Sequence, residues 1–185
     1  MAPLSKSKRS LTPEDETRIL KERARELASE PVAASAPVDL IQVVEFELAG
    51  EGYGIELARV RQVIALKEIT PVPCTPRFVL GIINLRGEIQ TVIDIRKFFD
   101  LPDRGITQLN RIIVIQSEGL HLGILADAIR GVRTIPRDSL QPPGPTFTGV
   151  RADYLRGVTE DRMAVLDAAK ILSDEGITIY EEVEG

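Results

Sequence analysis

The chain has 185 residues, of which 43% are hydrophobic and 28% charged, as in globular proteins with one core or two small lobes that share one. Aromatic residues make up only 4% and Trp is absent, so the surface on which single-stranded nucleic acids stack is missing. The net charge of -5 also argues against a phosphate backbone as the ligand, and we expect no nucleic-acid partner.

The chain has a single cysteine, which limits the disulfides and metal sites it can form. Cys74 cannot form an internal disulfide, and Cys74 with the lone His121 cannot supply the four ligands of a structural zinc site. The N-terminus lacks the apolar run of a secretory signal, and no stretch of about 18 apolar residues occurs. We therefore expect a cytoplasmic protein with no direct membrane insertion, no metal and no cofactor.

Residues 1–37 form an extension with helix signals of its own. Thr12 as N-cap, Pro13 at the first helical position and Pro31 as a stop predict a helix over about 13–29, followed by a linker rich in Pro and Ala. Its apolar stripe is narrow. Two interpretations remain open: a solvated helix resting on the domain or a neighbouring chain, or a dedicated partner-binding helix.

From Leu40 onward the pattern changes to short strands. Val and Ile dominate runs of strand-like length, and Gly and Pro turns such as "AGEGYG", "LRGE" and "SEGL" separate them. No long amphipathic pattern lies between the runs. The sequence therefore predicts an all-β sandwich or barrel with short helices, and a C-terminal tail over 176–185.

An internal repeat divides this part of the chain. "YGIELARVRQV" returns as "LGILADAIRGV", and "GEIQTVIDIRKFF" is echoed by "EDRMAVLDAAKIL". The order of features is the same in both copies. We expect two related β-lobes over about 50–105 and 119–175, within one domain over 38–175, which share apolar surface because each is small.

No catalytic set is recognisable. His121 lacks triad partners, Cys74 has no base beside it, and no metal loop or phosphate-binding Gly motif occurs. Asp94 and Asp167 recur at equivalent places, each after a strand-like run and before a short segment containing Lys. This position is typical of helix N-caps; a paired carboxylate site would need both lobes to converge on one cleft.

The tip of the hairpin "GIINLRGEIQTV" contains the best candidate contact residue. Asn84 and Gly87 are turn formers, and Arg86 between them is either a solvated turn residue or a contact to a partner. The apolar runs on both sides would hold the tip on a rigid scaffold, and Arg is enriched at interface hot spots.

Residues 53–99, with "ITPVP", "GIINLRGEI" and "VIDIR" in this order, resemble the CheW-like family. These coupling proteins join chemoreceptors to the histidine kinase CheA in bacterial chemotaxis arrays. The resemblance extends over about 38–172. It implies two interlocked five-stranded SH3-like β-barrels around a common core, and an adaptor without catalysis.

The resemblance also implies partners. The cytoplasmic tip of a chemoreceptor would bind in a groove that includes Val60, Gln62, Asn84, Arg86 and Gly87. The regulatory domain of a CheA-type kinase would contact exposed hairpins and strand edges, and both would recruit the protein to receptor arrays at the membrane.

Two positions depart from the family pattern, since Gln62 replaces a frequent acid and Cys74 a frequent Asn. The alternatives are a scaffold of a non-chemotactic pathway, in surface motility or gene control, and a β-barrel module for a ligand or nucleic acid.

Overall fold

The computed structural model describes three stretches of the chain: residues 39–66, 68–144 and 150–178. The helix expected over about 13–29 and the linker after it lie outside the described residues. So does the expected C-terminal tail from residue 179 onward.

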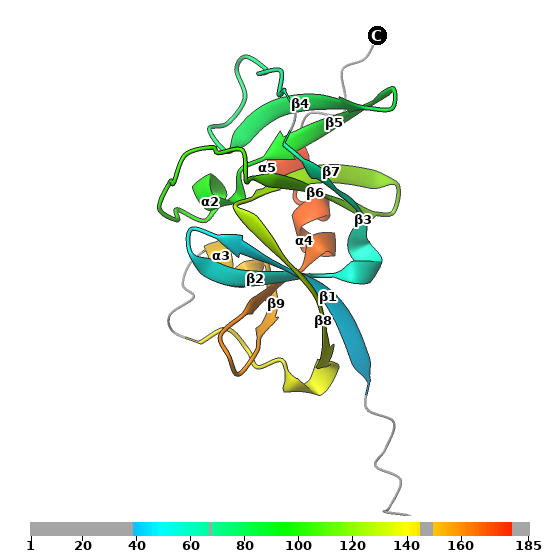
Figure 1. Ribbon diagram of the computed structural model, residues 1–185, viewed down its shortest axis with the longest axis vertical. Coiled ribbons are helices and arrows are strands. Elements are labelled where there is room, and N and C mark those ends of the chain that lie inside the picture. Colours follow the sequence, from blue (N-terminus) through cyan, green and yellow to red (C-terminus); the bar gives the residue numbers. More distant parts are fainter. Residues whose placement is uncertain (1–38, 67, 145–149, 179–185) are drawn as a thin grey trace, which may run out of the picture. The chain divides into compact units, whose positions relative to one another are not determined.

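Strands dominate the described chain, and they form two five-stranded sheets (Figure 1). Sheet A contains β1 (Leu40–Leu48), β2 (Glu51–Glu56), β8 (Ala128–Pro136), β9 (Leu155–Val158) and β10 (Ala164–Leu166). Sheet B contains β3 (Val60–Ala65), β4 (Val79–Leu85), β5 (Glu88–Ile93), β6 (Arg111–Ser117) and β7 (Leu120–Ala126). The short helices are η1 (Leu57–Arg59), α2 (Ile95–Phe98), η2 (Arg137–Ser139), α3 (Val150–Asp153), α4 (Ala168–Ser173) and α5 (Glu175–Thr178). The predicted fold class, all-β with short helices, is confirmed.

The two repeats exchange strands. Sheet A has the order β8-β1-β2-β10-β9 and sheet B the order β3-β6-β7-β5-β4, so each sheet joins the hairpin of one repeat to three strands of the other. The junctions are the parallel pairs β2 with β10 and β5 with β7. The interlocked architecture is confirmed, but the lobe bounds of 50–105 and 119–175 do not coincide with the two sheets, because the chain crosses between sheets after β2 and after β7.

Two-residue turns connect the three tight hairpins β1–β2, β4–β5 and β6–β7. Their central residues share positive φ angles: Ala49 (52°) and Gly50 (88°), Arg86 (57°) and Gly87 (93°), and Glu118 (51°) and Gly119 (86°). Two consecutive positive φ angles are the geometry of a type I′ turn, whose twist matches that of the flanking strands. The turn signals in the sequence therefore fall at the hairpins.

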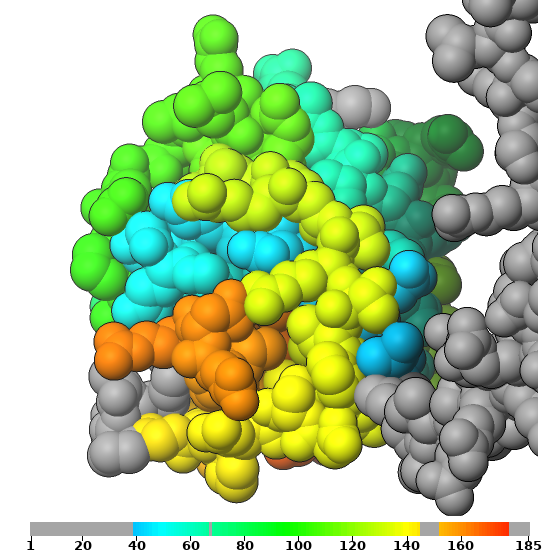
Figure 2. Space-filling view, turned by 60° about the horizontal axis from the view of Figure 1, so that its bottom comes forward, coloured from blue at the N-terminus to red at the C-terminus, as the bar shows by residue number. Residues whose placement is uncertain are grey.

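The segments that follow β3 and β8 bring the edges of each sheet together. Thr70 forms a bridge with Ile82 of β4, and Gln141 forms the equivalent bridge with Val158 of β9. Figure 2 shows the yellow segment after β8 beside the orange residues of β9 and β10. At Gly81 a Cβ would lie 2.2 Å from the Thr70 carbonyl oxygen, so the first closure requires glycine.

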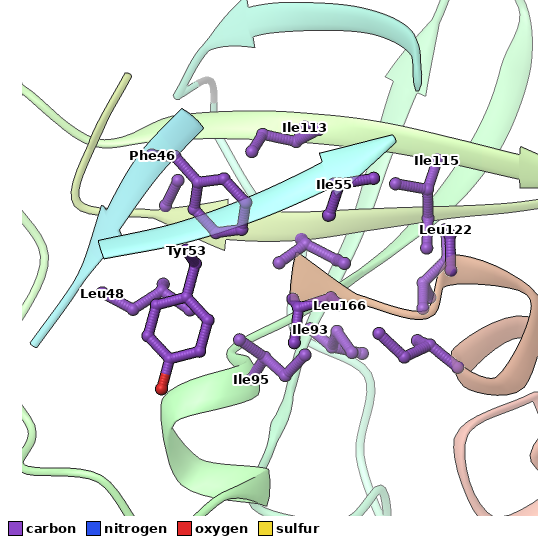
Figure 3. Close-up of a cluster of buried hydrophobic side chains, with 14 of the residues drawn as sticks. Phe46, Leu48, Tyr53, Ile55, Ile93, Ile95, Ile113, Ile115, Leu122 and Leu166 are labelled. Atoms are coloured by element: carbon purple, nitrogen blue, oxygen red, sulfur yellow. The ribbon is translucent and has the colours of Figure 1, made fainter. Parts of the chain in front are cut away.

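One large apolar core is shared by both sheets (Figure 3). Each sheet also has a small core of its own. The shared core includes Phe46, Leu48, Tyr53 and Ile55 from sheet A and Ile93, Ile113, Ile115 and Leu122 from sheet B. Ile177 of α5 is 1% exposed and belongs to it as well, so the tail expected from residue 176 begins inside a packed helix. Since most buried apolar residues are shared, the two sheets stabilise each other.

Candidate functional site

The β4–β5 hairpin presents Arg86 at its tip. The Asn84 side chain accepts a hydrogen bond from the Gly87 N–H (2.8 Å), so Asn84 stabilises the turn. The Arg86 side chain is exposed and has no hydrogen bond or ion pair with the residues that the structure describes. Of these predicted contact residues, Arg86 is therefore the one whose polar group is available to a partner.

Strand β3, an edge strand of sheet B, supplies the other predicted residues. Its side chains alternate: Val60 and Gln62 are half-buried, whereas Arg61 and Val63 are exposed. The register of β3 against β6 shifts between Val60 and Gln62, so the predicted pair does not share a face: Val60 packs against the shared core, whereas Gln62 lies opposite Val114 of the core of sheet B. The sequence analysis missed the exposed Arg61 and Val63.

Residues of β3 and of the hairpin tip together line a small pocket of about 180 Å³. We call it the hairpin-tip pocket; its lining residues are Arg61, Gln62, Leu85, Arg86 and Glu88. Of the five residues expected in a receptor groove, Gln62 and Arg86 line this pocket, whereas Val60, Asn84 and Gly87 do not. Leu85 belongs to the apolar core of sheet B, which anchors the pocket to a packed scaffold.

An ion pair spans this pocket and fixes its charge. Arg61 Nη1 donates to Glu88 Oε2 at 2.7 Å and Arg61 Nη2 donates to Glu88 Oε1 at 3.3 Å. The hydrogen bond from Arg61, together with its charge, lowers the pKa of Glu88. Because Arg61 and Glu88 neutralise each other, Arg86 is the remaining charge of the hairpin-tip pocket.

Two large apolar side chains are exposed on the strands that line the pocket. Val63 on β3 is 39% exposed, and Ile89 on β5 is 60% exposed. Strand alternation places both on the face of sheet B opposite to the pocket residues Gln62 and Glu88. Exposed apolar groups and an available cation are typical of protein contact surfaces. The arrangement can recognise a partner, and it contains no nucleophile and base in contact.

A buried charge cluster, which the sequence analysis missed, connects the two sheets. Arg96 is 1% exposed; its Nε donates to Asp94 at 2.8 Å and its Nη1 to Asp127 at 2.7 Å. Asp127 also accepts a hydrogen bond from the Ala49 N–H (2.7 Å) in the β1–β2 turn. The hydrogen bond to Asp94 raises the pKa of Arg96. The sequence held no signal for this cluster, because "VIDIR" does not show that its arginine is buried.

Asp94 and Asp167 are both helix N-caps. The Asp94 side chain accepts from the Arg96 N–H (3.1 Å), and the Asp167 side chain accepts from Ala169 N–H (3.1 Å) and Lys170 N–H (3.2 Å). Each satisfies amide donors at the start of a helix that lack a partner within the helix. Asp94 has the second task of pairing with the buried Arg96.

A larger pocket of about 620 Å³ lies near the start of β2 and the β9–β10 turn. Its lining includes Glu51, Glu160 and Asp161. The Asp161 carboxylate is engaged by Arg133 (2.5 Å) and by the Thr159 hydroxyl (2.6 Å), and these hydrogen bonds lower its pKa to about 2. The Asp161 carboxylate in the pocket wall is therefore already bonded within the protein.

A metal site and a membrane-spanning helix each place requirements on the part of the chain that the structure describes. Among residues 39–66, 68–144 and 150–178, no cluster of three or more His, Cys, Asp or Glu side chains could hold a metal ion. In the same part of the chain, no helix is long and apolar enough to cross a membrane. Cys74 is an exposed free cysteine, and His121 is half-buried on β7.

The pattern of residues 42–176 matches the family described as CheW-like domain. The chain belongs to the CheW-like family. Chemotaxis protein CheW of Treponema pallidum is 33% identical over 141 residues, which cover 72% of this chain and 83% of that protein. Chemotaxis protein CheW of Klebsiella aerogenes is 29% identical over 143 residues, covering 75% of this chain and 85% of that protein.

A solved structure agrees with this membership. The crystal structure of scaffolding protein TtCheW from Thermoanaerobacter tengcongensis superposes with a TM-score of 0.63 at 34% identity. The similarity covers 75% of this CheW-like chain and 89% of that structure. The two sheets, their strand exchange and the shared core are thus the fold of a CheW-like domain.

Proposed function

We propose that this CheW-like chain is a non-catalytic adaptor that couples chemoreceptors to a CheA-type histidine kinase in a signalling array. The observation that carries the proposal is the match of nearly the whole described domain to proteins named chemotaxis protein CheW and to a scaffolding protein. Arg86 of the hairpin-tip pocket, which is exposed and unpaired among the described residues, supports it as a contact available to a partner.

The hairpin-tip pocket is the proposed contact with the cytoplasmic helical tip of the receptor. A helix that docks on a surface needs apolar contacts for affinity and charged contacts for register. Arg86 offers a cation for a carboxylate of the receptor, and Val63 and Ile89 offer apolar contacts on the other face of the same strands. Gly87 and Asn84 contribute by shaping the turn that holds Arg86 in place.

The regulatory domain of the kinase is the second proposed partner, on exposed hairpins and strand edges away from this pocket. Binding to receptors and kinase would bring the chain to the membrane through its partners. The alternative is the same adaptor role in a pathway other than chemotaxis, and the partners that bind decide between the two.

The test is a binding experiment with purified partners from the same organism. The full chain is titrated separately with a receptor cytoplasmic hairpin and with a CheA-type regulatory domain, and the expected result is binding to both. A matched pair of variants maps the site: Arg86→Glu should lose receptor binding, whereas Arg77→Glu, at the opposite end of β4, should keep it. Absence of binding to every receptor hairpin and regulatory domain of the organism would refute the proposal.

A further inference from the structure

Gln90 on β5 has a buried side-chain oxygen that finds no hydrogen-bond donor among the described residues. The residue is only 5% exposed, and its Oε1 has no hydrogen-bond partner; within the described residues the side chain makes no other hydrogen bond. Leaving a buried polar group without a partner lowers stability, because the group loses its hydrogen bonds to water on folding. Buried amides in proteins are nearly always bonded, so this one requires an explanation.

Strand register places Gln90 directly beneath the hairpin-tip pocket. Leu85 faces Glu88 across the β4–β5 hairpin, and Ile83 faces Gln90 two residues farther along each strand. Side chains two residues apart share a face of the sheet, so all four lie on the same face. Leu85 and Glu88 line the pocket, and Gln90 therefore belongs to the next layer inward.

The layer below Gln90 is apolar. Ile83 and Val92, its neighbours on this face, belong to the core of sheet B together with Ile112 and Val114. A leucine at position 90 would extend this core and remove the unsatisfied amide. An amide that lowers stability at the boundary between a core and a pocket is the kind of local conflict that marks a functional position.

The charges around the pocket restrict which side chain of a partner can bond to Gln90. Its buried oxygen needs a donor, which an ionised carboxylate cannot supply. A lysine could donate, but Arg86 at the rim would repel it. A neutral side chain that both donates and accepts, an amide or hydroxyl, satisfies Gln90 and can also accept from the half-buried Gln62 amide, for which no hydrogen bond is seen among the described residues.

We infer that Gln90 is a buried specificity determinant of the partner site, which receives a neutral polar side chain from the helix that docks on the hairpin-tip pocket. This inference rests on the proposed function. Arg86 and Gln90 then have different tasks. Arg86 pairs with a carboxylate at the rim, and Gln90 distinguishes a polar from an apolar side chain one layer deeper.

The test compares Gln90→Leu with Gln42→Leu, an exposed glutamine on β1 of sheet A, in the full chain. Gln90→Leu should unfold at the same or a higher urea concentration, because a buried unsatisfied amide is removed. Its affinity for the receptor hairpin should fall about fivefold to tenfold, the loss expected for one hydrogen bond. Its affinity for the kinase regulatory domain should stay unchanged, and Gln42→Leu should match the unchanged chain in both assays.

A second arm identifies the partner's side chain. Neutral polar residues at the receptor tip are replaced by leucine one at a time, and one of these changes should weaken binding to the unchanged chain but not to Gln90→Leu. Equal receptor affinity of Gln90→Leu and the unchanged chain would overturn the inference, as would a parallel loss of stability and of binding to both partners. Failure of the unchanged chain to bind any receptor hairpin would instead refute the proposed receptor site and this inference with it.

Discussion

Buried Arg96 and half-buried Asp127 form an ion pair, with 2.7 Å between Nη1 and Oδ1. Arg96 lies on α2, just after β5 leaves sheet B, and Asp127 stands between β7 of sheet B and β8 of sheet A. Asp127 also holds the β1–β2 turn through the Ala49 N–H. One guanidinium thus links the segments that follow β5 and β7 of sheet B, and Asp127 ties them to the β1–β2 turn of sheet A.

Replacing Arg96 by methionine should destabilise the protein strongly. Removal of one partner leaves Asp94 (1% exposed) and Asp127 (18% exposed) without their cation, and breaking a buried pair costs about 3 to 5 kcal/mol. Urea unfolding of the full chain measures the change. The control is Arg77→Met, whose pair with Asp100 is exposed and should matter by less than about 1 kcal/mol. Similar losses in both variants would contradict the structural role of Arg96.

Two glycines with positive φ should respond differently to alanine. At Gly81 (φ 139°) the added Cβ would meet the Thr70 carbonyl oxygen at 2.2 Å, whereas at Gly87 (φ 93°) no atom lies within 4 Å. Gly87→Ala should cost about 1 kcal/mol from backbone strain alone. Gly81→Ala should cost about 3 kcal/mol, since overpacking is added and the bridge that closes sheet B is disturbed. The measurement is the melting temperature of each variant. Equal melting temperatures for Gly81→Ala and Gly87→Ala would show that the Thr70–Ile82 bridge adjusts freely.

Arg86→Glu should separate binding from folding. The side chain is exposed and unpaired within the described chain, so the free energy of unfolding should change by less than about 1 kcal/mol. Affinity for the receptor hairpin should fall at least about tenfold, because attraction becomes repulsion, and raising the salt concentration should reduce the difference. Equal losses of stability and affinity would assign Arg86 a structural role.

The Arg133–Asp161 pair should make a small part of the stability depend on pH. Hydrogen bonds from Arg133 and Thr159 lower the pKa of Asp161 from 3.8 to about 2 in the folded protein. A lowered pKa means that the contribution is present above about pH 4 and is lost as the pH falls toward 2. The side chains are 40% and 53% exposed, so it should not exceed about 1 kcal/mol. Asp161→Asn should differ from the unchanged chain at about pH 6 and converge with it near pH 2; a constant difference would contradict this.

Local features of the fold were predictable from the sequence. Dipeptides ending in glycine mark the turns of the three tight hairpins, because a type I′ turn needs positive φ at both positions. Asp94 and Asp167 are N-caps where the repeat placed them, because a cap depends only on the next three residues. Arg86 could be placed at a hairpin tip because Gly87 follows it in such a dipeptide.

The rest of the site depended on contacts between distant segments. Gln62 and Arg86 share a pocket only because β3 and the β4–β5 hairpin belong to one sheet, and Glu88 neutralises Arg61 across that sheet. The sequence could not show which face of β3 packs on the core of sheet B, because that depends on the pairing of β3 with β6.

The sequence by itself determined the periodicity, turns, caps and internal repeat of this protein, since each depends on neighbours a few residues away. Only the tertiary structure decided that the repeats exchange strands and that Arg96 is buried while Arg86 is exposed. It also decided that the Gln90 oxygen is buried beneath a pocket with no donor among the described residues. Burial and strand pairing are set by residues far apart in the chain, and one sequence alone does not record which of them meet.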